Sequence, residues 1–487
     1  MSNISKSLYC NYVQCKKQIW LNKYKPEEYV ETKKESIMEN GNEVGDLARH
    51  YFGNYSLVMF NEALIKMIMQ TKEYIKQNKK VICEASFKFD NLFASIDILK
   101  IDDDGVNIYE VKSSTEIKDI YIDDASFQSY ILKKLGYKVK SVNIMHINGF
   151  YELKGELDLN SLFKIENITE LTIKKEKEIE LNVKEINEIL DSDIEPSVDL
   201  DIHCFKPYDC PFFKYCSRKL KENNVFDIKG MTINKKIELY KKGFSSFSDL
   251  INLPLKEKYI EQMDFELNKN KPKINKENIK KFLSTLTDPI YFLDFETFQD
   301  AIPRYEGQRV YQQVPFQYSL HYYEDNKLKH KEFLSEPDID PRRSVALNLV
   351  KDIPVDVTVL AYNMSFEKNV IKSLSKLYPD LENKLMRIHD NIKDLMLPFY
   401  NRDYYVKEME GSYSIKYVLP ALFPNNKDLD YHNLDTIHNG SEAMNSYRNL
   451  RKYNKEEQNK IKKSLLKYCE LDTYAMVKIY EKLKEIE

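Results

Sequence analysis

The sequence predicts a mixed α/β protein in which a helical connector joins two α/β units. Two stretches, 81–147 and 289–485, alternate strand-like runs rich in β-branched and aromatic residues with segments of helical periodicity. The stretch between them, about 225–285, is lysine-rich and helical in pattern, with only short Ser/Pro breaks. A chain of 487 residues is also too long for one hydrophobic core.

Composition restricts the class of protein. The chain is 42% hydrophobic and 31% charged and has no run of about 18 apolar residues, so no membrane partner is expected. The first residues lack the apolar core of a secretory signal, which predicts a cytoplasmic protein without structural disulfides. The net charge of −3 gives no global basic field, so nucleic-acid binding would depend on local Lys-rich patches and bound metal ions.

The N-terminal region is expected to be helical to about residue 80 and then to form a sheet. Apolar residues recur at helical spacing in Gly45–Tyr51 and in Asn61–Gln77. Asp102-Asp103-Asp104-Gly105 separates two strand-like runs, which predicts a β-hairpin. The expected strands are Val81–Phe89, Phe93–Ile101, Val106–Ser113 and Ser141–Ile147, and the expected helices are Asp124–Leu135 and 171–195.

Three charged residues of this region form a first candidate site. Glu110 and Lys112 alternate on one strand and share a face, and Asp97 on the preceding strand can reach the same side. Carboxylates bind Mg²⁺ or Mn²⁺, and a lysine ammonium can stabilise charge that builds on a phosphate. The alternative is a cross-strand ion pair on a surface hairpin.

The order of these residues resembles the RecB-type PD-(D/E)xK nucleases, particularly the CRISPR-associated RecB-like exonucleases that carry an iron–sulfur cluster. The matching features are Asp97 on a strand, E-V-K-S-S at 110–114 and a helix with Gln128. The resemblance implies a restriction-endonuclease-like fold over 1–222. The family's tyrosine one turn after the glutamine is Leu132 here, so only Gln128 carries over. Its upstream metal-binding histidine corresponds to His50, for which a surface histidine is the alternative.

The cysteines extend this resemblance. Cys204, Cys210 and Cys216 lie within 13 residues, and Cys15 lies far upstream. In RecB-like iron–sulfur nucleases, one early and three late cysteines bind a [4Fe–4S] cluster, so the resemblance implies these four as ligands. The spacing departs from the family, whose first two late cysteines are usually closer together, and Cys10 is a fifth candidate. Structural Zn²⁺ and four unlinked buried thiols are the alternatives.

The C-terminal unit contains a second candidate site. Asp294 and Glu296 are two residues apart in a strand-like run and point to one face, where they repel each other unless a cation lies between them. Tyr468 and Asp472 share one face of a late helix. The alternative is an edge strand with two solvated acids. Strands are expected near 290–296, 315–323 and 357–362, and helices near 343–352, 365–377 and 457–485.

This pattern resembles the DnaQ-like, DEDDy-type 3′–5′ exonucleases, which implies an RNase H-like fold for 286–487. Asp294 and Glu296 match the first motif, and Tyr468 and Asp472 match the third. The second motif departs from the family because Glu367, in N-M-S-F-E, replaces an Asp. The resemblance implies hydrolysis with two metal ions about 3.5–4 Å apart, with Tyr468 orienting the attacking water. A core tyrosine is the alternative for Tyr468.

Together these features predict a metal-dependent nuclease that hydrolyses phosphodiester bonds of DNA ends or single strands. We expect domains at 1–222 and 286–487 with a connector at 223–285, Mg²⁺ or Mn²⁺ as cofactor, and DNA in preference to RNA as partner. The full arrangement resembles a family of uncharacterised bacterial proteins that contain a domain of unknown function. One decayed site, with Glu367 making the C-terminal site more suspect, and a non-catalytic nucleic-acid-binding scaffold are the alternatives. The sequence identifies no protein partner.

Overall fold

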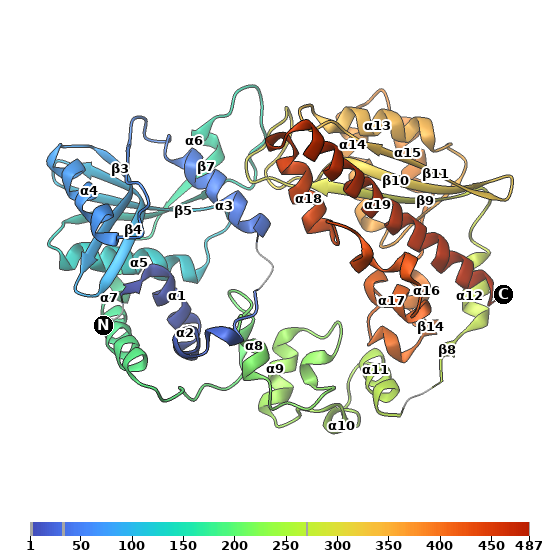
Figure 1. The fold of residues 1–487 in the computed structure, drawn as a ribbon, viewed down its shortest axis with the longest axis horizontal. Helices are drawn as coiled ribbons and strands as arrows, with labels where there is room; N and C mark the ends of the chain where they lie inside the picture. Colours follow the sequence, from blue (N-terminus) through green and yellow to red (C-terminus); the bar gives the residue numbers. More distant parts are fainter. Residues whose placement is uncertain (1–2, 32–34, 269–270, 487) are drawn as a thin grey trace. The chain divides into compact units, whose positions relative to one another are not determined.

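The computed structural model divides the chain into two compact units, each with a sheet and packed helices (Figure 1). The mixed α/β class is therefore confirmed. Unit 1 consists of Met1–Leu220 and Asp300–Tyr311, and unit 2 of Lys221–Gln299 and Gln312–Glu487. The residues that the structure describes are 3–31, 35–268 and 271–486.

Unit 1 is built on a seven-stranded sheet with the order β2-β3-β4-β5-β6-β7, in which β1 also pairs with β4. The predicted hairpin is confirmed, because β4 and β5 run antiparallel with Asp102 opposite Gly105. Gly105 has a φ of +153°, and a Cβ there would lie 2.4 Å from the Lys138 carbonyl oxygen, so glycine is required. The strands are β1 (Ile4–Ser5), β2 (Ser56–Leu57), β3 (Val81–Phe89), β4 (Leu92–Asp102), β5 (Gly105–Lys112), β6 (Val139–Ile147) and β7 (Phe163–Asn167).

Helices cover both faces of this sheet. Side chains of α1, α2, α4, α5 and α7 form one core cluster with the sheet, and α3 contributes to a second cluster on the other face. The third helix ends at Ala48, so the predicted helical stretch to Tyr51 was too long by three residues, which instead form a turn. The helices are α1 (Lys6–Gln14), α2 (Lys16–Tyr24), α3 (Glu35–Ala48), α4 (Leu64–Lys76), α5 (Asp119–Lys134), α6 (Leu159–Leu162), α7 (Thr169–Asp191) and α8 (Phe213–Cys216).

The lysine-rich stretch at the start of unit 2 is helical, as predicted. Its apolar residues form a small core of their own, centred on Val225, Phe247 and Met263. The elements are α9 (Ile233–Lys241), α10 (Phe247–Leu250), α11 (Glu257–Asn268) and α12 (Lys276–Leu283), with the short strand β8 (Lys273–Ile274).

The main sheet of unit 2 has five strands in the order β11-β10-β9-β12-β13. The central strand β9 is antiparallel to β10 and parallel to β12. The sequence did not indicate β11, because this edge strand is largely exposed and charged and lacks an alternating apolar face. The strands are β9 (Ile290–Phe298), β10 (Val314–Glu324), β11 (Lys327–Leu334), β12 (Thr358–Ala361) and β13 (Ile392–Asp394), and a separate pair joins β8 to β14 (Tyr404–Tyr405).

Alternate residues of β9 face different helices. Leu293 and Phe295 pack with α13, α14 and α15, whereas Ile290 and Phe292 pack with α19, on the other side of the sheet (Figure 1). The even-numbered acids of β9 therefore lie on the α19 side. Across the described ranges, no helix combines the length and apolar character needed to cross a bilayer. The helices are α13 (Pro341–Asp352), α14 (Ser365–Leu377), α15 (Glu382–Asp390), α16 (Leu397–Tyr400), α17 (Ile415–Leu422), α18 (Gly440–Asn449) and α19 (Lys455–Lys484).

Candidate active sites

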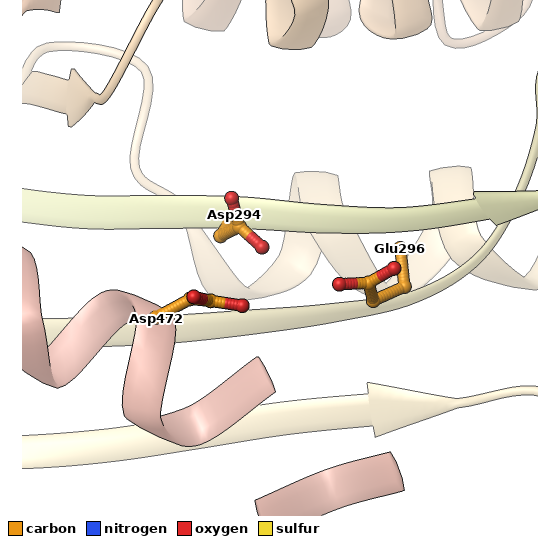
Figure 2. A group of neighbouring side chains, drawn as sticks. All are labelled: Asp294, Glu296 and Asp472. Carbon is orange, nitrogen blue, oxygen red and sulfur yellow. The ribbon is translucent and has the colours of Figure 1, made fainter. Parts of the chain in front are cut away.

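Three predicted carboxylates converge in unit 2. Figure 2 shows Asp294 and Glu296 on one strand beside Asp472 on a helix. One carboxylate oxygen from each residue lies within 4.8 Å of the other two. The convergence follows from local structure, because residues two apart on β9 share the face against which α19 packs. Such a set of oxygen donors suits a hard divalent cation.

The electrostatics of this trio are unfavourable without a cation. Burial, together with the charge of Asp472, raises the pKa of Asp294 and of Glu296 well above the ordinary range. Burial also raises the pKa of Asp472 to about 6, although hydrogen bonds from Tyr431 and Tyr468 oppose the shift. A divalent cation between these groups would stabilise their ionised forms.

Glu367 lies apart from the trio but acts on it electrostatically. It is buried in the first turn of α14, and burial followed by the charge of Asp394 raises its pKa to about 8. Its charge also contributes to the raised pKa of Asp294. Its Oε2 atom is buried and accepts no hydrogen bond from the described residues. A buried carboxylate oxygen without a partner is costly, so a cation ligand or a bound water fits this position.

Three further groups lie beside the trio, those of Tyr431, Cys469 and Lys416, and the sequence did not single out Tyr431 or Cys469 as site residues. The Tyr431 hydroxyl donates to Asp472 Oδ1 at 2.6 Å, and the Cys469 thiol lies 3.8 Å from Asp294 Oδ2. The positive charge of Lys416 lowers the pKa of Glu296 against the effect of burial. Tyr431 lies in a short 3₁₀ turn, Tyr431–Asn433, where no periodic pattern could have indicated it. Tyr468 is buried one turn before Asp472 on α19.

A second cluster in unit 1 contains Asp97, Glu110 and Lys112. Lys112 Nζ donates to Glu110 Oε1 at 2.6 Å, so these two side chains share one face of β5. Asp97 Oδ2 accepts from the Val111 backbone N–H at 2.8 Å. The carboxylate of Asp97 therefore satisfies a backbone donor of β5 and lies beside the two predicted partners.

Helix α5 completes the cluster. Gln128 Nε2 donates to Glu110 Oε2 at 2.6 Å and to Asp124 Oδ1 at 2.9 Å. Asp124 Oδ2 accepts from Lys112 Nζ at 2.8 Å. The sequence pattern did not indicate Asp124, although it lies four residues before Gln128 and hence on the same helix face. Each end of the Glu110–Lys112 pair is thus held by a side chain of α5.

Lys6 brings a second ammonium into the cluster. Its Nζ lies 3.3 Å from both Asp97 Oδ1 and Glu110 Oε1. Burial, with the charges of Asp124 and Asp97, raises the pKa of Glu110 to about 8. At Asp124, burial favours the neutral acid, but Lys6 and Lys112 outweigh it and lower the pKa below the ordinary range. Lys6 was not indicated by any sequence pattern.

A cavity of about 490 Å³ opens beside this cluster. His50, predicted as a metal ligand, is exposed, contacts the Tyr55 ring edge-on and is not among the lining residues. The lining includes its neighbour Arg49, which pairs with Glu84 at 3.3 Å. The residues that line the cavity are Lys6, Gly41, Asn42, Gly45, Asp46, Arg49, Glu84, Asp97, Ile98, Glu110, Val111 and Lys112.

The four predicted cysteines line one small pocket. Cys15, between α1 and α2, meets Cys204, Cys210 and Cys216 around a volume of about 10 Å³. Burial raises the pKa of Cys204 to about 12 and that of Cys210 to about 11. All seven cysteines are free thiols.

Cys10 lies elsewhere. It is absent from the described pocket lining, and burial followed by the charge of Asp124 raises its pKa above the ordinary range. This fifth candidate is thus closer to the acidic cluster of unit 1 than to the cysteine pocket.

Comparison with known proteins gives two similarities. A family model described as "Domain of unknown function (DUF2779)" matches residues 291–414. "Uncharacterized protein MG366" of Mycoplasma genitalium is 29% identical over 208 residues, which covers 39% of this chain and 31% of that protein. The chain therefore spans less than a third of the length of this curated relative. No solved structure matches the chain.

Proposed function

We propose that the protein is a metal-dependent nuclease with two active sites. The observation that carries this proposal is the convergence of Asp294, Glu296 and Asp472 within 4.8 Å. Acids in such an arrangement raise the free energy of the folded protein unless a cation binds them. This cost argues against a purely structural role and against a non-catalytic scaffold.

In unit 2, an RNase H-like exonuclease site is the proposed arrangement. Asp294, Glu296 and Asp472 would hold Mg²⁺ or Mn²⁺, with Glu367 as a further ligand, directly or through water. Bound ions of this kind polarise a phosphate and acidify a water. The Tyr468 hydroxyl, beside Asp472, would orient the attacking water. In this proposal the carboxylates bind the cation and Tyr468 orients the attacking water, two functions that phosphodiester hydrolysis requires.

In unit 1, a PD-(D/E)xK nuclease site of the RecB type is proposed. Asp97 and Glu110 would hold the cation, and the Lys112 ammonium would stabilise charge on the scissile phosphate. Asp124 and Gln128 fix Lys112 and Glu110 through the hydrogen bonds described above. Because Lys6 already contacts both proposed ligands, its ammonium must move when a cation binds. The cavity of about 490 Å³ gives a nucleotide access to this cluster.

The cysteine pocket is proposed as a structural metal centre. Four thiols on one pocket are a donor set for either a [4Fe–4S] cluster or Zn²⁺. The resemblance to RecB-like nucleases favours the cluster, and structural Zn²⁺ is the alternative. In either case, ligation would tie Cys15 to residues 204–216 and add to the free energy of unfolding.

The experiment that tests the proposal is cleavage of end-labelled single-stranded DNA and RNA in Mn²⁺, with protein purified anaerobically. Wild type is compared with Lys112→Ala, Asp294→Ala and the double variant. Lys100→Ala and Asp428→Ala serve as controls, because neither residue belongs to the clusters above. We expect each active-site variant to remove a distinct set of products and the double variant to be inactive. DNA cleavage in preference to RNA is also expected.

The same assay separates the alternatives. If only Lys112→Ala abolishes cleavage, the site around Glu367 has decayed. If the double variant cleaves as well as wild type does, the nuclease assignment is wrong and the scaffold role replaces it.

A further inference from the structure

The segment 300–311 connects β9 to β10 in sequence but belongs to unit 1. It begins four residues after Glu296 and ends three residues before β10. Its fold is stabilised from within, because Gln308 is fully buried and its Oε1 accepts from the backbone N–H groups of Arg304 and Tyr305. A side chain that closes its own loop in this way defines one conformation for the segment.

The backbone of the segment pairs with residues 151–153 of unit 1. Leu153 N–H donates to the Gln308 carbonyl at 2.9 Å, and Gly307 N–H donates to the Leu153 carbonyl at 2.8 Å. Glu152 and Arg309 form an antiparallel bridge, and their side chains make an ion pair at 3.2 Å. The segment thus pairs with residues 151–153 through one isolated antiparallel bridge and its neighbouring backbone hydrogen bonds.

Apolar side chains anchor the two ends of the segment. Ala301 is 1% exposed and Val310 is 8% exposed. Both belong to the core cluster that contains Met145 and Ile147 of β6. β6 is the parallel neighbour of β5, and Lys112 stands opposite His146 in that pairing. The segment therefore packs into the core under the strands that carry the unit 1 cluster.

Tyr311 contacts the residue that follows strand β5. Its hydroxyl donates to the Ser113 carbonyl, and Ser113 immediately follows Lys112. Tyr311 has a φ of +53°, a left-handed conformation that is unusual for an aromatic residue. The carbonyl of Ser114, the residue after Ser113, accepts a hydrogen bond from the Ile147 N–H at 3.0 Å. Tyr311 and Ile147 together anchor the turn that follows Lys112.

We propose that the segment 300–311 completes unit 1 and that Tyr311 is a positioning residue for Lys112. The hydroxyl of Tyr311 holds the carboxyl end of β5, so the Lys112 ammonium stays between Glu110 and Asp124. The consequence for cleavage rests on the proposed function, whereas the ordering of β5 does not. The segment that follows strand β9 in sequence thereby supports the unit 1 site.

The test uses full-length protein with Tyr311→Phe and Val310→Asp, and with Tyr29→Phe as the control for loss of a hydroxyl from a half-exposed tyrosine. Hydrogen exchange is followed in peptides that cover 106–116 and 148–155. We expect both segment variants to accelerate exchange in these peptides and Tyr29→Phe to leave it unchanged. For Tyr311→Phe the acceleration near Ser113 should be about 5-fold, as expected for one lost hydrogen bond.

Cleavage is then measured in an Asp294→Ala background, where only the unit 1 site contributes. We expect Tyr311→Phe to lower kcat about 5-fold with KM for DNA nearly unchanged, because the lost contact acts on Lys112 and not on the substrate. Unchanged exchange in both segment variants overturns the proposal, whether or not the protein is a nuclease. Faster exchange with unchanged kcat overturns the positioning role. If both segment variants exchange faster than wild type but wild type cleaves nothing, the role of the segment is supported and the nuclease assignment is refuted.

Discussion

Replacing Asp472 with asparagine tests whether the unit 2 acids are arranged for a cation at the expense of stability. The pKa of Asp472 is raised from 3.8 to about 6, chiefly by burial. Between these pH values the folded protein keeps a proton that the unfolded chain has lost, so the free energy of unfolding falls as the pH rises. Above about pH 6 the full cost is present, roughly 2–3 kcal/mol at about 1.4 kcal/mol per pKa unit.

Asparagine has the same shape and no charge, and its oxygen can still accept the hydrogen bond from Tyr431. In EDTA at pH 8, Asp472→Asn should therefore be more stable than wild type by roughly 2–3 kcal/mol. For a unit of this size, that difference corresponds to a Tm higher by about 4–12 °C. Mn²⁺ at about 1,000 times its Kd should reverse the order, because it then stabilises wild type by about 4.1 kcal/mol.

Thermal unfolding with and without Mn²⁺, followed by calorimetry, measures both effects. Asp428→Asn, at an exposed acid of unit 2, is the matched control and should leave the unit 2 transition unchanged. A cation site at these acids is excluded if Asp472→Asn gains no stability in EDTA, or if Mn²⁺ stabilises this variant as much as it stabilises wild type. Cleavage by the unit 2 site should be lost in the same variant.

Three other predictions follow from the described contacts. Lys6→Met removes a charge that competes with the cation, so it should lower the Mn²⁺ concentration for half-maximal cleavage by the unit 1 site about 5-fold. A metal titration in the Asp294→Ala background measures this. A reduced kcat at unchanged Mn²⁺ affinity contradicts the prediction. Burial, then His330, lowers the pKa of His321 to about 4, so the contribution of His321 to the free energy of unfolding should fall by roughly 3 kcal/mol as pH drops from about 6.5 to 4. Urea unfolding should show a weaker pH dependence in His321→Gln, and identical slopes would exclude the effect. Cys210→Ala should lose bound metal, whereas Cys83→Ala, which also truncates a buried thiol, should keep it. Iron with absorbance near about 400 nm identifies a cluster, and zinc without colour identifies the alternative.

Short-range patterns in the sequence account for the parts of the sites that lie on one element. Asp294 and Glu296 share a face because side chains two apart on any strand do so. The same rule places Glu110 beside Lys112, and the Asp-Gly turn places their strand next to Asp97. These relations depend on backbone geometry alone, so they hold before any packing is known. The charged edge strand β11 escaped prediction because it lacks such a pattern.

Contacts between distant segments were decided only by the tertiary structure. Lys6 meets Glu110 across 104 residues, and Tyr431 meets Asp472 across 41. Neither residue belongs to a periodic pattern that extends to its partner. The membership of 300–311 in unit 1 is of the same kind, since it depends on apolar anchors and backbone pairs that form only when β6 and residues 151–153 are in place. Sequence periodicity indicates which face of an element is buried, but the residues that this face contacts are determined only by tertiary packing.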